Sequence, residues 1–434
     1  MSDDALETTR RALRATLARG QSGKIPTLMR EHCLPLERKD DEIVVQRLML
    51  APEAPDGIEH AVPIVVVHCE RFSNEKPMPI VCFMHGTGGD TESLLDTQLA
   101  SFAKRGYLVV GVDAPCHGRR LDPDNGGDDK INNKKVDPTI RQDDDATHGH
   151  ASHTRSRVDT FERYGAALVA AWKGETADQS EGHTEYNYSA LARPFLFDGA
   201  WDALRAIQFI TKGNDKGVDN SHSLLLPKVD PLRVGISGIS LGGMYSWLAA
   251  AAAPEIVTGA VAPLIGAQDF SYGLRNEMWR ARVASLPPQL FDEAVKDYDL
   301  STGTSTALNS DIVKQVYSRI TPGLLDEFDG PQTFPLIAPI PLLILNGELD
   351  PRNPIGGVCG VVSTTKKVYA QLDCTPETFT ALAQRDTAHV CTDAMLRLTN
   401  QWLDATLRPE GCAVKSRKEV VTSALRDKKT WREL

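Results

Sequence analysis

A serine flanked by glycines is the strongest chemical signal in this chain. Ser240 lies in the segment Gly-Ile-Ser-Leu-Gly-Gly, residues 238–243, which fits the pattern Gly-x-Ser-x-Gly. An apolar strand is expected at 233–237 and a helix at 241–252. This order would expose the serine hydroxyl at the end of the strand, beside a helix N-terminus that stabilises developing negative charge. The segment therefore predicts a nucleophilic serine.

A serine hydroxyl becomes a good nucleophile only when a base takes its proton, and the base needs a carboxylate to orient it. His389 is the single histidine after Ser240, so it is the expected base. Asp350 follows an apolar strand predicted at 341–346 and is the expected carboxylate. Glu348 is its rival on the same loop, and Asp386 is a more remote alternative. The expected catalytic residues are therefore Ser240, Asp350 and His389.

A glycine-rich loop offers the means to stabilise an oxyanion. Residues 85–89, His-Gly-Thr-Gly-Gly, come directly after a strand predicted at 79–84. Glycines let the backbone approach a substrate, so the amides of Thr87 and Leu241 are the expected oxyanion donors. His85 is interpreted as a residue that orients this loop rather than as a base. Three residues are further candidates for substrate contact: His85, Gly88 and His117, the last either lining the pocket or bracing its own loop.

The elements that must position these residues alternate between strand and helix. Such an order predicts a parallel sheet with right-handed crossovers, so the fold class is α/β. The expected strands are 42–50, 61–68, 79–84, 107–113, 233–237, 256–262, 341–346 and about 377–382, and the expected helices are 3–19, 92–104, 158–172, 198–210, 241–252, 276–283, 310–320 and 392–407.

Two long irregular segments interrupt this alternation. We expect an N-terminal helical extension at 1–41, a hydrolytic core at 42–117 and 196–410, and a basic C-terminal tail at 411–434. The polar segment 118–195 is expected to form a cap, and 268–335 a second insertion within the core. Both should leave the carboxyl edge of the sheet, where ligands bind in such folds.

Composition excludes several classes of function. Hydrophobic residues make up 41% and charged residues 24%, as in globular proteins, which excludes wholesale disorder. The net charge of −10 disfavours nucleic-acid binding by a basic face. None of the 8 cysteines forms a Cys-x-x-Cys pair, which excludes zinc fingers and thioredoxin-like sites. Free thiols, with no apolar leader, predict a cytoplasmic protein.

No cofactor is expected. The longest apolar stretch, 247–267, contains prolines and glycines and is interpreted as a helix followed by a strand rather than a membrane span. No dinucleotide or phosphate-binding motif is present. Aspartates 143–145 with His148, His150 and His153 could ligate a metal, but a solvated loop explains them as well. The expected partner is a small ester substrate, and the sequence leaves homo-oligomer formation open.

These motifs together resemble the α/β-hydrolase superfamily over residues 42–407. The loop at 85–89, the run Asp-Ala-Pro-Cys-His-Gly at 113–118 and the serine motif are similar to dienelactone-hydrolase-like and acetyl-esterase-like members. Dienelactone hydrolases carry a cysteine where this chain has Ser240, which argues against dienelactone as substrate. The resemblance implies a mostly parallel, eight-stranded sheet flanked by helices, with cap insertions.

The activity that this resemblance implies is hydrolysis of carboxylic esters through an acyl-enzyme on Ser240. The alternatives on the same catalytic residues are a peptidase or amidase and a thioesterase. A binding protein without turnover is an alternative from another class.

Overall fold

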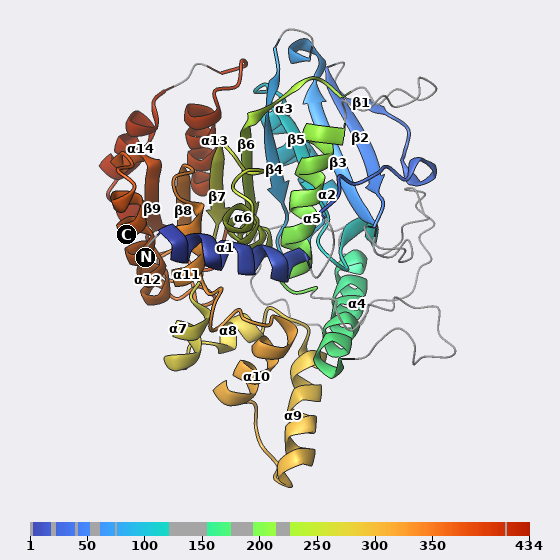
Figure 1. The fold of residues 1–434 in the computed structure, drawn as a ribbon, viewed down its shortest axis with the longest axis vertical. Helices are drawn as coiled ribbons and strands as arrows, with labels where there is room; N and C mark the ends of the chain where they lie inside the picture. Colours follow the sequence, from blue (N-terminus) through green and yellow to red (C-terminus); the bar gives the residue numbers. More distant parts are fainter. Residues whose placement is uncertain are drawn as a thin grey trace.

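The computed structural model describes residues 3–18, 23–39, 42–52, 61–73, 76–120, 154–174, 194–213, 226–412 and 415–434. Within them, one sheet of ten strands forms the centre of the protein, in the order β1-β2-β3-β5-β4-β6-β7-β8-β9-β10 (Figure 1). The strands are β1 (Glu37–Lys39), β2 (Ile43–Leu50), β3 (Val62–Cys69), β4 (Met78–Met84), β5 (Leu108–Val112), β6 (Val229–Ile239), β7 (Ala260–Leu264), β8 (Leu342–Gly347), β9 (Phe379–Gln384) and β10 (Trp431–Glu433).

The middle of the sheet is parallel and its margins are antiparallel. Strands β5, β4, β6, β7, β8 and β9 pair in parallel, whereas β1, β2 and β3 on one side and β10 on the other pair antiparallel. Parallel strands end at the same edge of a sheet, so the loops after β4, β6, β8 and β9 emerge together. The prediction of a mostly parallel α/β sheet is therefore confirmed.

The predicted number of strands is wrong, because the sheet has ten rather than eight. The two additional strands, β1 and β10, lie at opposite edges and span three residues each. They occur in segments that the sequence assigned to the N-terminal extension and the C-terminal tail. Short, charged edge strands carry no apolar alternation, so only their pairing with β2 and β9 defines them.

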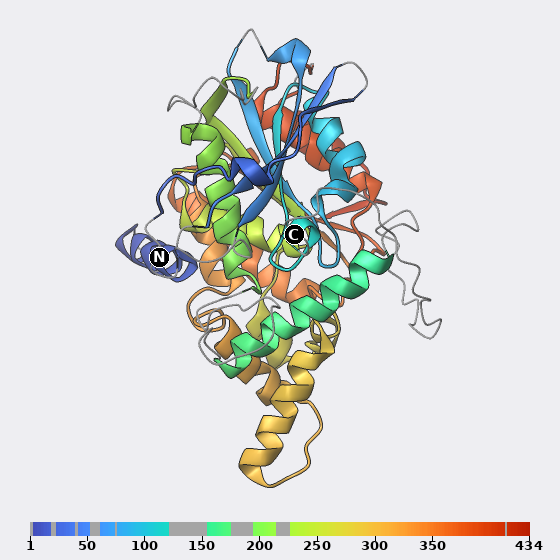
Figure 2. The ribbon, with the colours of Figure 1, turned by 90° about the vertical axis from the view of Figure 1, so that its right-hand side faces the viewer.

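Helices cover both faces of the sheet (Figures 1 and 2). One buried cluster joins one face to α1 (Asp3–Ala18), α5 (Phe197–Gln208), α6 (Leu241–Ala252) and α12 (Ile355–Gln371). A second cluster joins the other face to α2 (Thr91–Leu94), α3 (Ala100–Ala103), α13 (Asp393–Leu407) and α14 (Arg417–Arg426). Strand β4 shows why: Ile80 and Cys82 enter the first cluster, and Val81 and Phe83 the second. A strand buried on both faces needs apolar residues at every position.

The remaining helices gather beyond one end of the sheet (Figure 1). There α4 packs against α9 and α10, and Trp172 Nε1 donates a 2.7 Å hydrogen bond to Asp297. These helices are α4 (Thr154–Lys173), α7 (Phe270–Arg275), α8 (Arg280–Val283), α9 (Pro288–Thr302) and α10 (Ser310–Ile320), and α11 (Gly330–Thr333) leads back toward β8. The aspartates 143–145 and His148, His150 and His153 lie outside the described residues.

Three local predictions differ from the structure. The helix expected at 92–104 is divided by a π-helical turn, Leu95–Leu99. The helix expected at 276–283 begins only at Arg280, as α8, because Glu277 adopts φ 55° and separates α7 from α8. The strand expected at 256–262 begins only at β7, because residues 254–258 form a turn in which the amides of Ile256 and Val257 bond to Ala253 O. Ile256 and Val257 are apolar because they are buried, although the backbone at these residues is not extended.

No helix in the described part of the chain is long and apolar enough to span a membrane.

Candidate active site

The register of the sheet brings four loops to one place. Met84 of β4 pairs with Gly238 of β6, so the glycine-rich loop and the serine turn start side by side. Strand β8 pairs with β9 up to Gly347 and Gln384, so their following loops also meet. These two loops are joined further by the Leu349 amide, which donates to Thr387 O at 2.9 Å.

The turn that carries Ser240 is strained. Ser240 adopts φ 54° and ψ −105° between β6 and α6, and its amide donates to Leu264 O at 2.9 Å. An L-residue with positive φ costs on the order of 1–3 kcal/mol and persists only when its surroundings impose it. The surroundings of the turn are tightly packed, since a Cβ on Gly242 would lie 2.4 Å from Met84 O. The glycine spacing around the serine is thus a steric requirement of this turn.

Ser240, His389 and Asp350 form a continuous chain of hydrogen bonds. Ser240 Oγ lies 2.8 Å from His389 Nε2, and His389 Nδ1 lies 2.7 Å from Asp350 Oδ2. A carboxylate can only accept, so Nδ1 carries the imidazole proton and Nε2 is the acceptor for the serine hydroxyl. The structure therefore brings together the three residues that the sequence selected, in the orientation needed to remove the serine proton.

Asp350 is buried and held by its own loop. Its Oδ1 accepts from the amides of Arg352 and Asn353 at 2.8 and 3.0 Å, and Oδ2 accepts from Asn353 Nδ2 at 3.0 Å. Burial works to raise the pKa of Asp350, but the hydrogen bond and charge of His389 and the Asn353 amide hold it below its ordinary value. Asp350 is thus an ionised carboxylate fixed toward His389.

His389 is neutral under ordinary conditions. Burial lowers the pKa of His389, and its contact with Asp350 opposes that shift only in part. A neutral imidazole with a free acceptor nitrogen is the protonation state that a general base requires.

The glycine-rich loop lies against the serine turn. Gly242 donates its amide to His85 O at 3.1 Å, and a Cβ on Gly86 would lie 3.6 Å from Ser240 Cβ. Gly88 has φ 79° and follows Thr87 in a turn closed by the Gly89 amide on Gly86 O at 3.1 Å. Leu241 is the first residue of α6, where amides lack partners within the helix. Leu241 is therefore the chain neighbour of Ser240, and Thr87 follows Gly86, the loop residue that lies against Ser240; their role as oxyanion donors stays a prediction.

His85 is bonded to backbone on both sides of its ring. Its Nδ1 lies 2.8 Å from Gly86 O, and its Nε2 accepts from the Ala114 amide at 3.0 Å. The first contact lies within the loop after β4, and the second ties that loop to the loop after β5. These contacts place His85 where it can orient the loops, and its role stays a prediction.

His117 lies in the loop after β5 and is fully buried. Its Nδ1 donates to Pro115 O at 2.7 Å, while its Nε2 has no hydrogen-bond partner among the described residues. Burial lowers the pKa of His117 to about 3, so the ring is neutral. Its ring meets that of His85 with centroids 5.3 Å apart. His117 braces the loop, and a role in substrate contact stays a prediction.

Sequence reasoning missed two residues of this site, Asn353 and Arg282. Asn353 follows Asp350 by three residues, the spacing at which an aspartate bonds the backbone of its own turn, and this signal could have revealed it. Arg282 reaches the site from α8, and no local pattern marks it. Its Nη2 donates to Asn353 Oδ1 at 2.6 Å.

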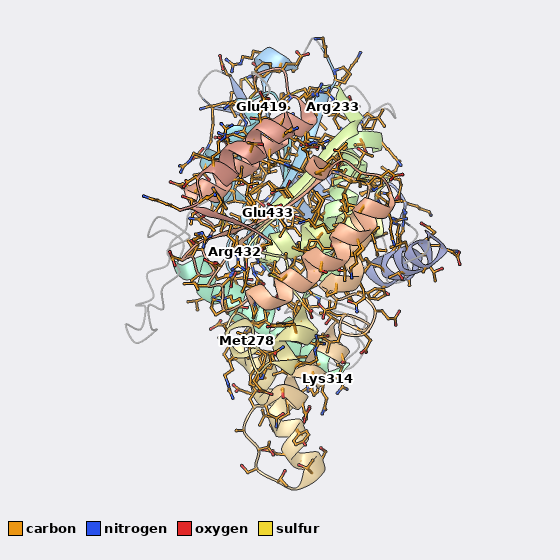
Figure 3. The ribbon with its side chains drawn as sticks, turned by 90° about the vertical axis from the view of Figure 1, so that its left-hand side faces the viewer. Arg233, Met278, Lys314, Glu419, Arg432 and Glu433 are labelled. Carbon is orange, nitrogen blue, oxygen red and sulfur yellow. The ribbon has the colours of Figure 1, made fainter. Side chains whose placement is uncertain are left out.

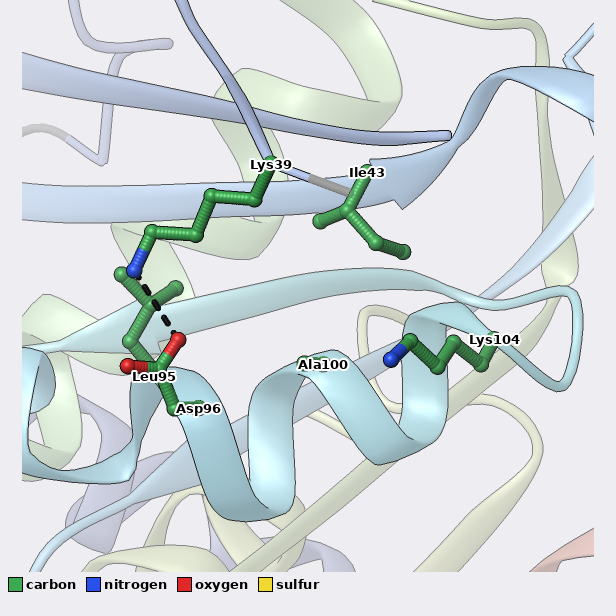
Figure 4. Close-up of a pocket in the computed structure, with 6 residues that line it drawn as sticks. All are labelled: Lys39, Ile43, Leu95, Asp96, Ala100 and Lys104. Atoms are coloured by element: carbon green, nitrogen blue, oxygen red, sulfur yellow. Dashed lines mark hydrogen bonds and ion pairs between the residues drawn. The ribbon is translucent and has the colours of Figure 1, made fainter. Parts of the chain in front are cut away.

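A separate hollow of about 420 Å³ lies elsewhere on the described surface (Figure 4). It is lined by Lys39, Ile43, Leu95, Asp96, Ala100 and Lys104, and Lys39 Nζ donates to Asp96 Oδ1 at 2.9 Å. None of these residues belongs to the hydrogen-bonded chain around Ser240, so this hollow is not part of the candidate site.

No protein-family model matches this sequence, and neither does any curated protein. Among solved structures, a provisionally assigned acetyl xylan esterase from Bacteroides fragilis has a TM-score of 0.52 and 15% identity, covering 98% of this chain and 89% of its own. Acetyl xylan esterase 1 from Thermoanaerobacterium has a TM-score of 0.47 and 13% identity, and the match covers 94% of this chain and 99% of that protein. A glucuronoyl esterase from Solibacter usitatus has a TM-score of 0.48 and 12% identity, and the match covers 93% of each chain. The first of these shows that the chain has the α/β-hydrolase fold, as the sequence predicted.

Proposed function

We propose that this protein is a serine hydrolase that cleaves carboxylic esters through an acyl-enzyme on Ser240. The observation that carries the proposal is the chain of hydrogen bonds from Ser240 through His389 to Asp350, at 2.8 and 2.7 Å. Nothing in this chain of contacts needs to move before the serine proton can pass to the imidazole. Geometry of this kind recurs on unrelated folds wherever a serine attacks a carbonyl group.

The first half-reaction forms the acyl-enzyme. Ser240 Oγ attacks the ester carbonyl carbon while His389 Nε2 takes the hydroxyl proton, and Asp350 stabilises the resulting imidazolium. The negative charge on the carbonyl oxygen is stabilised by the amides of Thr87 and Leu241. The tetrahedral intermediate then expels the alcohol, which leaves with the proton from His389.

The second half-reaction returns the free enzyme. His389 takes a proton from water, and the hydroxide attacks the acyl carbon. The second tetrahedral intermediate collapses with return of the proton to Ser240 Oγ, and the carboxylic acid is released. No step requires a group from outside the chain, so the proposal includes no cofactor.

The two insertions, 118–195 and 268–335, are proposed as the parts that select the substrate. Helices α4 and α7–α10 belong to them, and α4, α7, α9 and α10 pack together beyond the sheet edge. The same catalytic residues could act on thioesters, amides or peptides, so the insertions decide between these classes. We place the reaction in the cytoplasm, since all eight cysteines are free thiols.

The test uses purified protein, a fluorophosphonate probe and a panel of p-nitrophenyl esters. Acetyl esters come first, because the Bacteroides fragilis neighbour is provisionally described as an acetyl xylan esterase. We expect the wild type to be labelled and to hydrolyse short acyl esters. Ser240→Ala should fold normally, resist labelling and lose kcat by on the order of 10⁴- to 10⁶-fold.

Two results would reject this function. Equal labelling and turnover in folded Ser240→Ala would remove the nucleophile from the proposal. Labelling without hydrolysis of any ester, alongside turnover of thioesters or amides, would transfer the activity to one of those classes.

A further inference from the structure

Arg282 is a buried cation beside the proposed catalytic carboxylate. It lies on α8, inside the second insertion, and its side chain is 3% exposed. Its Nη2 donates to Asn353 Oδ1 at 2.6 Å and approaches Arg352 O at 3.5 Å. Burial lowers the pKa of Arg282 to about 10, so the guanidinium remains charged at neutral pH. A buried charge is costly unless its partners are well placed, so these contacts need an explanation.

The guanidinium favours the same orientation of the Asn353 amide as the two acceptors on its other side. Arginine can only donate hydrogen bonds, so the amide edge that faces it must be the oxygen. The NH₂ group then faces two acceptors, Ile265 O at 2.6 Å and Asp350 Oδ2 at 3.0 Å. A flipped amide would set an NH₂ against the guanidinium and an oxygen against the carboxylate. Both contacts would be repulsive, so one orientation is strongly favoured.

The favoured orientation in turn fixes Asp350. Oδ2 of Asp350 receives both the Asn353 NH₂ at 3.0 Å and the His389 Nδ1 proton at 2.7 Å. Without the Asn353 donor, only the imidazole would hold Oδ2, and the carboxylate would depend on the two backbone amides that bond to Oδ1. The geometry therefore links a residue of the insertion to Asp350 through two hydrogen bonds, and to the base His389 through a third.

We propose that Arg282 is a positioning residue, which orients the Asn353 amide and so holds Asp350 toward His389. This inference rests on the proposed serine hydrolase function. It assigns the insertion a second role, since α8 would support the catalytic carboxylate as well as help to enclose the substrate. The titratable groups around this contact are Asp350, Arg352 and His389, with the Tyr317 hydroxyl group of α10 also close to Arg282.

The first experiment compares Arg282→Met with Arg280→Met. Arg280 is on the same helix, is exposed and stacks on Trp279, so it controls for loss of one positive charge. We expect Arg282→Met to lower kcat on the best ester by on the order of 10²-fold with little change in KM, because the base is misplaced. Arg280→Met should stay within a few-fold of wild type. A proportional loss in both variants, or a change in KM alone, would overturn the proposal.

The second experiment tests whether Arg282 acts through Asn353. In a double-mutant cycle, Arg282→Met should cost far less in an Asn353→Ala background than in the wild type. Additive losses would overturn the proposal. If Arg282→Met does not fold, Asn353→Asp takes its place: it keeps an acceptor for Arg282 but cannot donate to Asp350. Its kcat should fall although the guanidinium keeps its partner, and normal turnover would contradict the proposal.

The third experiment does not depend on turnover. Proton NMR of the His389 Nδ1–H reports its hydrogen bond to Asp350 directly. We expect its downfield resonance to move upfield or disappear in Arg282→Met and to persist in Arg280→Met. Failure of the proposed esterase activity would leave this signal intact in the wild type, whereas failure of the positioning role would leave it unchanged in Arg282→Met.

Discussion

Arg432 Nη1 donates a hydrogen bond of 2.8 Å to Glu348 Oε1, and this contact separates the two carboxylates of the loop after β8. Arg432 lies on the edge strand β10, where Figure 3 labels it next to Glu433. The Arg432 contact lowers the pKa of Glu348 and keeps its carboxylate ionised at the surface. Asp350, two residues later, is buried against His389. One loop thus supplies one carboxylate to the edge of the sheet and the other to the site.

This separation predicts unequal losses on neutralising the two carboxylates. Asp350→Asn should lower kcat by on the order of 10⁴-fold, because the amide cannot stabilise the imidazolium and favours the wrong tautomer. Glu348→Gln should retain near-normal turnover and change stability by about 1 kcal/mol at most, as for other surface ion pairs. Steady-state kinetics and urea unfolding measure both. Reversed results would assign the role to Glu348, and equal mild effects would direct attention to Asp386.

The rate should depend on pH through a single ionisation of His389. Burial lowers the pKa of His389, and Asp350 offsets this only in part, so the net shift is downward. Below that pKa the imidazolium cannot accept the serine proton, so kcat/KM falls as the pH falls. At neutral pH the rate should already be on its plateau. A pH profile of kcat/KM checks this, and a midpoint above the ordinary histidine value of about 6.5 would contradict it.

The strained turn predicts an unusual effect of glycine at the nucleophile. Ser240 has φ 54°, which glycine adopts without the steric cost that alanine shares with serine. Ser240→Gly should therefore be more stable than Ser240→Ala by about 1 kcal/mol, after allowing for the greater flexibility of glycine when unfolded. Urea unfolding of the two inactive variants gives the difference directly. Equal stability would mean that the turn stores no strain at this position.

A buried histidine away from the site should make the protein sensitive to acid. Burial lowers the pKa of His68, on β3, to about 4. Between about pH 6.5 and 4 the unfolded chain therefore binds a proton at His68 that the folded chain does not. The contribution of His68 to the free energy of unfolding should therefore fall by about 1.4 kcal/mol for each pH unit by which the pH is lowered within that window. Above the window this contribution should stay constant.

Replacing His68 tests this directly. His68→Leu should lose less stability than wild type between pH 7 and 4.5, as measured by urea unfolding at each pH. Gln46→Leu is the matched control, because Gln46 is also a buried polar residue, lies on the neighbouring strand β2 and does not titrate. An equal pH dependence in His68→Leu and wild type would contradict the assignment.

The parts of this protein that could be predicted from sequence are those encoded locally. Ser240 was recognisable because strand, turn and helix follow one another within 24 residues, Val229–Ala252, and because the turn tolerates only small residues at Gly238 and Gly242. His389 was recognisable as the base because no other histidine follows Ser240 in the sequence. The parallel core was predictable because strands buried on both faces must be apolar at every position.

Tertiary structure alone decided the features whose partners are distant in sequence. Strands β1 and β10 exist only because β2 and β9 offer free edges, and their charged residues carry no pattern that marks a strand. Arg282 meets Asn353 across 71 residues, on a helix whose start the sequence misplaced because Glu277 adopts positive φ. Local backbone preferences and hydrophobic periodicity act within a few residues, whereas a hydrogen bond between an insertion and a core loop depends on how the whole sheet places them.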